Sequence, residues 1–144
     1  MGSMPEGGDQ RDRPLVLLVE DQLELRQLYA QELSMSGFDV IEAGNGAEAI
    51  AHTADRRPDV VLMDLSLPVL DGWEATRRIK DDARTAHIPI VALTAHDGSG
   101  ELQRATRAGC DWFVPKPCQP LDLIEEVRRV LGGGSGRGTP VTQI

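Results

Sequence analysis

Short β-rich runs alternate with helical segments along this chain, and that alternation constrains its fold more than any other feature. The runs cover residues 15–19, 38–43, 60–63, 88–93 and 112–114. Most of them are apolar throughout, which is typical of strands buried on both faces of a sheet. Strands that alternate with helices form parallel sheets, and right-handed crossovers place helices on both faces. We therefore predict a doubly wound α/β fold with a five-stranded parallel sheet.

The segments between the runs carry helix signals, because apolar residues recur there at helical spacing. These residues are Leu23, Leu25, Leu28, Tyr29 and Leu33 in the first helix and Leu121, Ile124, Val127 and Leu131 in the last. Trp73, Thr76, Arg77 and Ile79 are assigned to a third helix. Gly37 is positioned to end the first helix. Shorter helices are predicted over 47–53 and over 101–108, and the last helix over 121–131.

A chain of 144 residues is long enough to bury one core without disulfide or metal support. Residues 1–13 are polar and charged, with a second methionine after a start that resembles the remnant of an expression tag. We therefore predict one domain over 14–131. Residues 132–144 are Gly-rich and are interpreted as a flexible tail or the start of a linker. A natural single-domain protein and a domain cut from a longer one both fit this pattern.

The chain has 23 acidic and 15 basic residues, for a net charge of −8. This balance argues against direct nucleic-acid binding and against binding to anionic membranes. No apolar run approaches the length of a membrane span. The two cysteines, Cys110 and Cys118, form no disulfide framework and are interpreted as inert small side chains. We therefore expect a cytoplasmic protein.

Polar residues follow the predicted strands at the points where they end. Glu20 and Asp21 follow the first strand, Asp64 the third, Thr94 the fourth and Lys116 the fifth. A single polar residue at a strand end is ordinary, since loops are solvated. In open α/β sheets, however, the carboxyl ends of the strands form the ligand-binding edge. We therefore expect these five side chains to converge.

The residue types at this edge favour one chemistry. Clustered carboxylates repel one another unless a cation neutralises them, and all-oxygen ligation suits Mg²⁺ better than zinc. The three histidines, His52, His87 and His96, show no metal-ligand spacing. An aspartate carboxylate can attack phosphorus to form an acyl phosphate, with Mg²⁺ and a lysine offsetting charge on the phosphoryl oxygens.

Four motifs give the chain a resemblance to the receiver domains of two-component response regulators. They are VLLVEDQ around Glu20 and Asp21, VVLMDLSLPVLDGW around Asp64, IVALTAH around Thr94, and FVPKPC around Lys116. In this order and spacing they are specific, and the resemblance covers residues 14–131, with some similarity to single-domain, chemotaxis-type members. It implies a flavodoxin-like strand order of 2-1-3-4-5.

The resemblance also implies residue roles. Asp64 would be the phosphoacceptor, and Asp21 would ligate Mg²⁺ directly. Glu20 would act on the ion through water or by setting the charge of the site. The backbone carbonyl of Ser66 would be a further ligand, and Lys116 would pair with the phosphoryl group.

The same resemblance makes Thr94 the switch hydroxyl and Phe113 the switch aromatic. Phenylalanine lacks the hydroxyl of the tyrosine often found there, so its ring cannot make an outward hydrogen bond. The bond between Lys116 and Pro117 resembles the family's cis peptide. His96 lies two residues beyond Thr94, and we expect it to modulate the lifetime of the phosphoryl group.

The function implied is a signalling switch that catalyses only its own phosphoryl transfer and autodephosphorylation. The expected donor is a sensor histidine kinase or a histidine phosphotransfer protein. Phosphorylation would change the face built from the fourth helix, fifth strand and fifth helix. The expected partner of that face is a downstream protein, and phosphorylation-dependent dimerisation is a further possibility.

Three other functions are alternatives to this interpretation. A phosphohydrolase of the haloacid dehalogenase type needs a second aspartate two residues after the nucleophile, where this chain has Ser66. A flavin-binding module needs a phosphate-cradling loop after the first strand, where this chain is acidic. A scaffold without phosphorylation would not need the full set of site residues. Among single residues, Phe113, Trp73 and Trp112 also fit plain packing roles, and Pro68, Asp71 and Gly72 fit a loop and turn.

Overall fold

The computed structural model describes residues 12–65, 71–94, 103–104, 107–115, 119–132 and 139–140. Its strands are β1 (Leu15–Val19), β2 (Asp39–Ala43), β3 (Val60–Asp64), β4 (Ile90–Thr94), β5 (Trp112–Pro115) and β6 (Thr139–Pro140). Its helices are α1 (Leu23–Met35), α2 (Gly46–Arg56), α3 (Gly72–Asp81) and α5 (Pro120–Gly132). The first five strands are parallel and lie in the order β2-β1-β3-β4-β5, which confirms the predicted fold.

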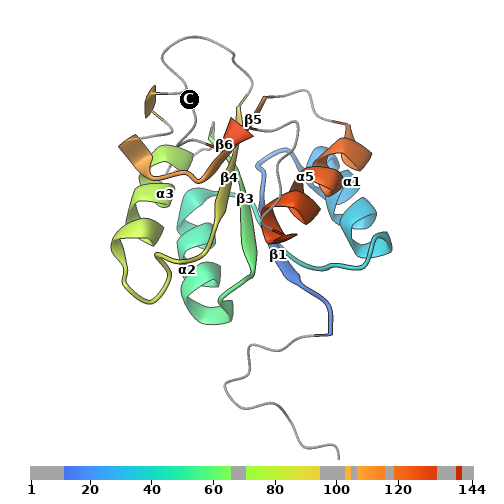
Figure 1. Ribbon diagram of the computed structural model, residues 1–144, viewed down its shortest axis with the longest axis horizontal. Helices are drawn as coiled ribbons and strands as arrows, with labels where there is room; N and C mark the ends of the chain where they lie inside the picture. Colours follow the sequence, from blue (N-terminus) through green and yellow to red (C-terminus); the bar gives the residue numbers. More distant parts are fainter. Residues whose placement is uncertain are drawn as a thin grey trace, which may run out of the picture.

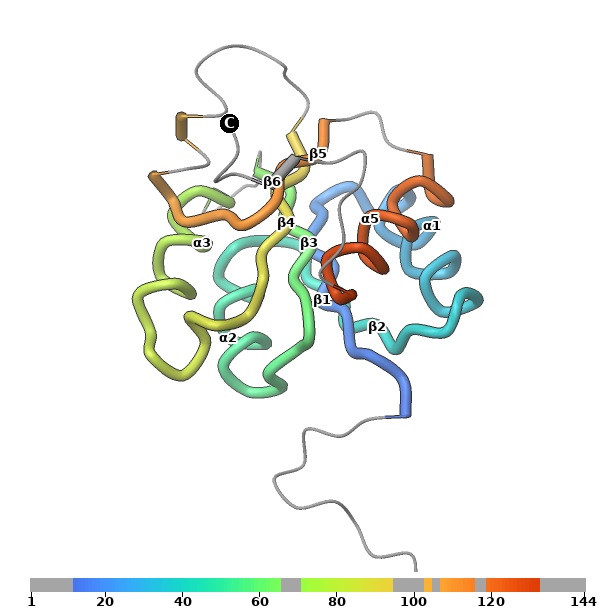
Figure 2. Tube along the Cα trace, in the orientation of Figure 1, coloured from blue at the N-terminus to red at the C-terminus, as the bar shows by residue number. Residues whose placement is uncertain are grey.

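Helices cover both faces of the sheet, with α1 and α5 on one face and α2 and α3 on the other (Figures 1 and 2). Alternating residues of the central strands point to opposite faces. Val16 and Leu18 of β1 join the core beneath α1 and α5, whereas Leu17 joins the core beneath α2 and α3. Because both faces are covered, β1, β3 and β4 are buried along their whole length, and their apolar sequences follow from this.

Capping residues set the starts of two helices. The side chain of Asn45 accepts a hydrogen bond from the amide of Glu48 at 2.9 Å, and that of Asp71 accepts one from the amide of Glu74 at 2.8 Å. Both satisfy amides that have no partner within the helix. The caps place the start of α2 at Gly46, one residue before the predicted helix, and α2 continues to Arg56 rather than ending at residue 53.

Other boundaries differ by one or two residues. β2 begins at Asp39 and β4 at Ile90, and α5 begins at Pro120 and ends at Gly132. Of the helix predicted over 101–108, residues 103–104 and 107–108 are described, and they are helical.

The leucines of α1 recur at helical spacing, but they do not all lie on the buried face of the helix. The helix buries Tyr29, Ala30 and Leu33, whereas Leu23 and Leu28 are 52% and 44% exposed. Leucine spacing marks an apolar stripe, but the position of the sheet and α5 decides which part of the stripe is covered.

The short strand β6 was not indicated by the sequence pattern. Within the predicted tail over 132–144, Thr139–Pro140 pairs antiparallel with β5 and makes a sixth strand of the sheet. Within the described residues, no helix combines the length and the apolar character needed to cross a membrane.

Candidate functional site

Strand register brings the carboxyl ends of the central strands to one edge of the sheet. Val19 of β1 lies opposite Met63 of β3, and Asp64, the next residue, lies opposite Leu93 of β4. Thr94, the last residue of β4, lies opposite Pro115 of β5. Glu20, Asp21, Asp64 and Thr94, the described residues that end or follow these strands, therefore lie at one edge of the sheet.

Three carboxylates meet at this edge, and we call them the acidic cluster: Glu20, Asp21 and Asp64. One carboxylate oxygen from each lies within 4.8 Å of the others. Glu20 is fully buried and Asp64 is 4% exposed, whereas Asp21 is exposed. The cluster thus has two buried carboxylates and one that reaches solvent.

The donor set fits a hard divalent cation. All three groups offer carboxylate oxygens, which Mg²⁺ prefers. With Mg–O distances near 2.0–2.1 Å, two oxygens on one ion are at most about 4.2 Å apart, so oxygens that lie within 4.8 Å of one another need only small shifts to share one ion. His52 is half-buried and His87 is exposed, and neither belongs to the cluster.

Backbone contacts fix Glu20 at the start of this edge. Its amide donates to the carbonyl of Ala43 in β2 at 3.0 Å, and its side chain accepts from the amide of Gln22 at 3.2 Å. Arg26 of α1 donates to the Glu20 carbonyl at 3.0 Å and also to the Glu42 carboxylate at 3.0 Å. Glu20 is therefore positioned jointly by β2 and α1.

The start of α3 packs directly against the backbone of Asp64. A Cβ on Gly72 would lie 2.4 Å from the Asp64 carbonyl oxygen and 2.7 Å from the Leu65 Cα, so only glycine fits. The Gly72 amide donates to the Leu65 carbonyl at 3.3 Å, and the Leu65 amide donates to Leu93 at 3.1 Å. Sequence reasoning treats Asp71 and Gly72 only as a turn; this contact was missed because it involves residues apart in the chain.

Thr94 and Phe113 belong to the same face of the sheet. Thr94 is 3% exposed and follows Ala92 by two residues, and Ala92 lies opposite Phe113. Phe113 is 7% exposed and packs in the core beneath α2 and α3. The aromatic ring is therefore in an inward position in this structure.

Three of the predicted site residues lie outside the described residues: Ser66, His96 and Lys116. Pro117 and Cys118 also lie outside them. The described residue nearest to Lys116 in sequence is Pro115, which pairs with Thr94.

Two tryptophans connect neighbouring elements and are buried, as the packing interpretation predicts. The Arg104 guanidinium lies over the Trp73 ring, 4.4 Å from its centroid. The buried Trp112 indole donates from Nε1 to Glu126 Oε1 of α5 at 3.2 Å. Sequence analysis does not single out Arg104 or Glu126; a buried indole's need for an acceptor was the available signal.

Cys110 is buried, and that burial raises the pKa of its thiol to about 12. The thiolate is the reactive form of cysteine. Cys110 therefore fits the expected inert role.

Comparison with known proteins gives a consistent result. The family model described as the response regulator receiver domain matches residues 16–128. A polar-differentiation response regulator, DivK of Brucella anthropi, is 36% identical over 117 residues, covering 81% of this chain and 95% of its own.

Solved structures of other receiver proteins resemble this chain in both fold and sequence. A chemotaxis response regulator of Vibrio cholerae has a TM-score of 0.77 and 29% identity, covering 82% of this chain and 98% of its own. The receiver domain of a sensor histidine kinase from Pseudomonas aeruginosa PAO1 has a TM-score of 0.77 and 32% identity, with 83% and 98% covered. The latter structure holds a magnesium ion coordinated in its active-site cleft.

Proposed function

The chain belongs to the response regulator receiver domain family, and from that premise we propose that Asp64 is the phosphoacceptor of a phosphorylation-dependent switch. Members of this family act as signalling switches rather than as classical enzymes, and they interact with histidine kinases and downstream targets. The observation that carries the proposal is the acidic cluster, in which the buried Asp64 carboxylate lies within 4.8 Å of two further carboxylates.

Asp64 would act as a nucleophile toward a phosphohistidine on the donor. Its carboxylate oxygen forms a bond to phosphorus while the bond between phosphorus and the histidine nitrogen breaks, and the electron pair of that bond stays on the imidazole. Gly72 and the Leu65 amide hold the Asp64 backbone between α3 and β4, which fixes the direction of attack.

Glu20, Asp21 and Asp64 would hold Mg²⁺, and the Ser66 carbonyl is proposed as a further ligand. Bound there, the ion would offset negative charge on the phosphoryl oxygens. Lys116 is proposed to pair with the same phosphoryl group from β5's side of the edge. The burial of Glu20 and Asp64 limits water around these charges and strengthens their interactions.

Thr94 and Phe113 are proposed as the switch pair. The Thr94 hydroxyl would donate to the phosphoryl oxygens, and the inward Phe113 would fill the space that Thr94 leaves on the shared face. Moving a population from 1:99 to 99:1 takes about 5.5 kcal/mol. Two or three hydrogen bonds to a charged group, at about 1.5–3 kcal/mol each, supply that amount. The changed face would bind a downstream protein or a second copy of the chain.

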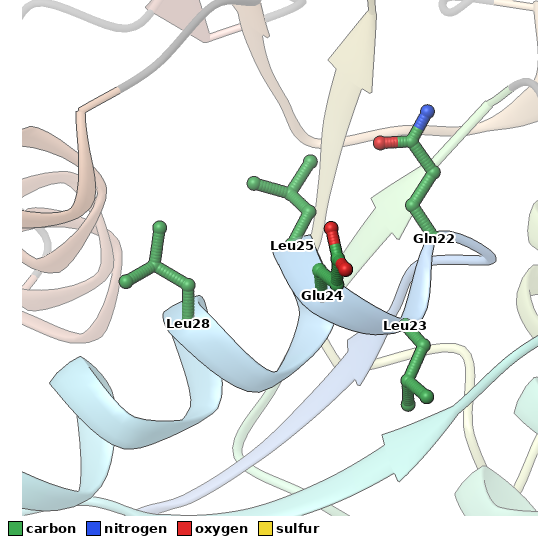
Figure 3. A pocket seen from close by; sticks show the side chains of 5 residues that line it. All are labelled: Gln22, Leu23, Glu24, Leu25 and Leu28. Carbon is green, nitrogen blue, oxygen red and sulfur yellow. The ribbon is translucent and has the colours of Figure 1, made fainter.

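The start of α1 offers a docking surface for the donor beside the acidic cluster. Gln22, Leu23, Glu24, Leu25 and Leu28 line a shallow hollow, shown in Figure 3. Leu23 and Leu28 remain strongly exposed there. Apolar side chains that the fold leaves uncovered next to a reactive site are suited to contact with another protein.

The test is direct phosphorylation by a small donor. With Mg²⁺ and acetyl phosphate, the native chain is expected to gain one phosphoryl group by intact mass, in an adduct stable to acid and labile to base. Asp64→Asn is expected to abolish the adduct, and Asp55→Asn, an exposed change in α2, is expected to keep it. An adduct that persists in Asp64→Asn would refute the assignment. Continuous release of phosphate from a phosphomonoester would instead favour the dehalogenase-type alternative.

His96 is proposed to influence the water that hydrolyses the acyl phosphate. His96→Ala is expected to change the decay rate of the adduct several-fold while leaving its formation intact. The measurement is loss of the phosphoryl mass with time after the donor is removed, with His87→Ala as the matched control at an exposed site. Identical decay rates in native protein and His96→Ala would show that His96 has no influence on hydrolysis of the acyl phosphate.

A further inference from the structure

The two edges of the parallel sheet are protected in different ways. An edge strand exposes unpaired backbone N–H and C=O groups that can accept a strand from another chain. The β2 edge carries charges: Asp39 pairs with Arg13 at 3.3 Å, and Glu42 pairs with Arg26 at 3.0 Å. Charged side chains on an edge strand disfavour pairing with a further strand. The β2 edge is therefore protected by its own residues.

The β5 edge has no such charges. Its residues are Trp112, Phe113, Val114 and Pro115, and the first three are buried. In the structure β6 lies along the first half of this edge (Figure 1), with Phe113 opposite Thr139 and Trp112 opposite Pro140. The uncharged edge is thus the one that receives an added strand.

We propose that residues 139–140 act as a built-in cap, which occupies the β5 edge of its own chain and excludes a strand from any other molecule. Pro140 suits an outermost strand, because proline has no N–H to donate to a further neighbour. The occupant of the β5 edge is therefore a segment of this chain, and it ends the sheet there.

The length of chain after α5 is sufficient for pairing within one molecule. Seven residue steps separate Gly132 from Thr139, and at about 3.3–3.6 Å per residue they span up to about 23–25 Å. The four residues of β5 span about 13 Å at about 3.3 Å each. A short Gly-rich tether also gives an effective local concentration in the range of about 1 mM, which favours the intramolecular pairing over free partners.

The cap has a consequence for signalling that rests on the proposed function. Phe113 is the proposed switch aromatic, and the cap pairs with its backbone. A downstream protein that uses β5 would have to compete with residues 139–140. The cap therefore raises the threshold for binding at that face.

Hydrogen–deuterium exchange of the β5 amides tests the cap in the full chain. Thr139→Pro removes an N–H from β6, and it is expected to speed exchange of at least one amide within 112–114 by tenfold or more. Thr142→Pro, the matched control three residues further along the tail, is expected to leave that exchange within twofold of native. Equal exchange in native protein and Thr139→Pro would overturn the proposal.

The same measurement separates pairing within one chain from pairing between two. Exchange at 112–114 is expected to stay constant over a hundredfold range of protein concentration. Protection that grows with concentration would overturn the cap in favour of strand exchange between copies. The exchange measurement uses no phosphodonor and no Mg²⁺, so its result does not depend on phosphorylation. In the separate acetyl phosphate reaction, Thr139→Pro is expected to retain the adduct at Asp64. Failure of that adduct in native protein would therefore refute the proposed function and leave the cap standing.

Discussion

Gly72 shows how one residue type can connect helix packing to the position of a buried carboxylate. The first turn of α3 approaches the Asp64 carbonyl so closely that a methyl group would overlap it. The Asp71 cap fixes the start of the helix, and the Gly72 amide reaches the Leu65 carbonyl. The position of the Asp64 backbone therefore depends on the absence of a side chain at Gly72.

Gly72→Ala is expected to destabilise the fold by about 1–3 kcal/mol, the range for overpacking a filled site. It is also expected to slow formation of the Asp64 adduct, because the backbone of the nucleophile has to shift. Urea unfolding and the acetyl phosphate reaction measure the two effects. Gly132→Ala, where a new Cβ meets nothing within 4 Å, should stay within about 0.5 kcal/mol of native. Equal stability of the two variants would contradict the close contact.

The helix α1 packs one face against the sheet and leaves apolar residues exposed on another. Tyr29, Ala30 and Leu33 anchor it to the sheet, and Arg26 links it to the Glu20 carbonyl. Leu23 and Leu28 stay exposed near the acidic cluster, whereas Met35, 74% exposed, lies at the other end of the helix. Leu23 and Leu28 are therefore closer along the helix to the acidic cluster than Met35 is.

Replacing both Leu23 and Leu28 by serine is expected to slow phosphoryl transfer from a phosphorylated donor protein at least tenfold. The rate with acetyl phosphate is expected to stay within twofold of native, because no protein surface is needed for that donor. Met35→Ser is the matched control and is expected to leave both rates unchanged. A parallel loss of both rates would show that the leucines support the fold or the site rather than donor docking.

At the scale of the whole molecule, the acidic cluster brings together carboxylates from separate strands, and their repulsion destabilises the fold. Glu20 and Asp21 follow β1, Asp64 ends β3, and their like charges repel within 4.8 Å. A cation bound between them would remove that repulsion only in the folded chain, since unfolding separates Asp64 from Glu20 and Asp21. Metal binding and stability are therefore linked.

Mg²⁺ at one hundred times its dissociation constant is expected to raise the free energy of unfolding by about 2.7 kcal/mol. Urea unfolding with MgCl₂, against NaCl of equal ionic strength, measures the difference. Asp21→Asn is expected to shrink the gain, and Asp81→Asn, an exposed change at the end of α3, is expected to keep it. Identical midpoints in both salts would argue against a metal site in the cluster.

The alternation of strands and helices and the convergence of Glu20, Asp21 and Asp64 could be predicted from the amino-acid sequence alone, and the structure brings these carboxylates together. The physical reason is local: burial on both faces demands apolar strands, and the carboxyl ends of parallel strands share one edge. The strand order came from the resemblance of four motifs to a known family, and the fold confirms it. The roles of all the site residues stay predictions, and Ser66, His96 and Lys116 also lie outside the described residues.

Which residues of each element contact a neighbouring element follows from the three-dimensional packing and could not be predicted from the sequence. The packing left Leu23 and Leu28 exposed because the sheet and α5 cover the other side of α1. It required glycine at position 72 because α3 begins against the Asp64 carbonyl, and it paired Thr139 with Phe113 because the β5 edge was open. Each outcome depends on contacts between different elements of the fold, and local periodicity carries no information about them.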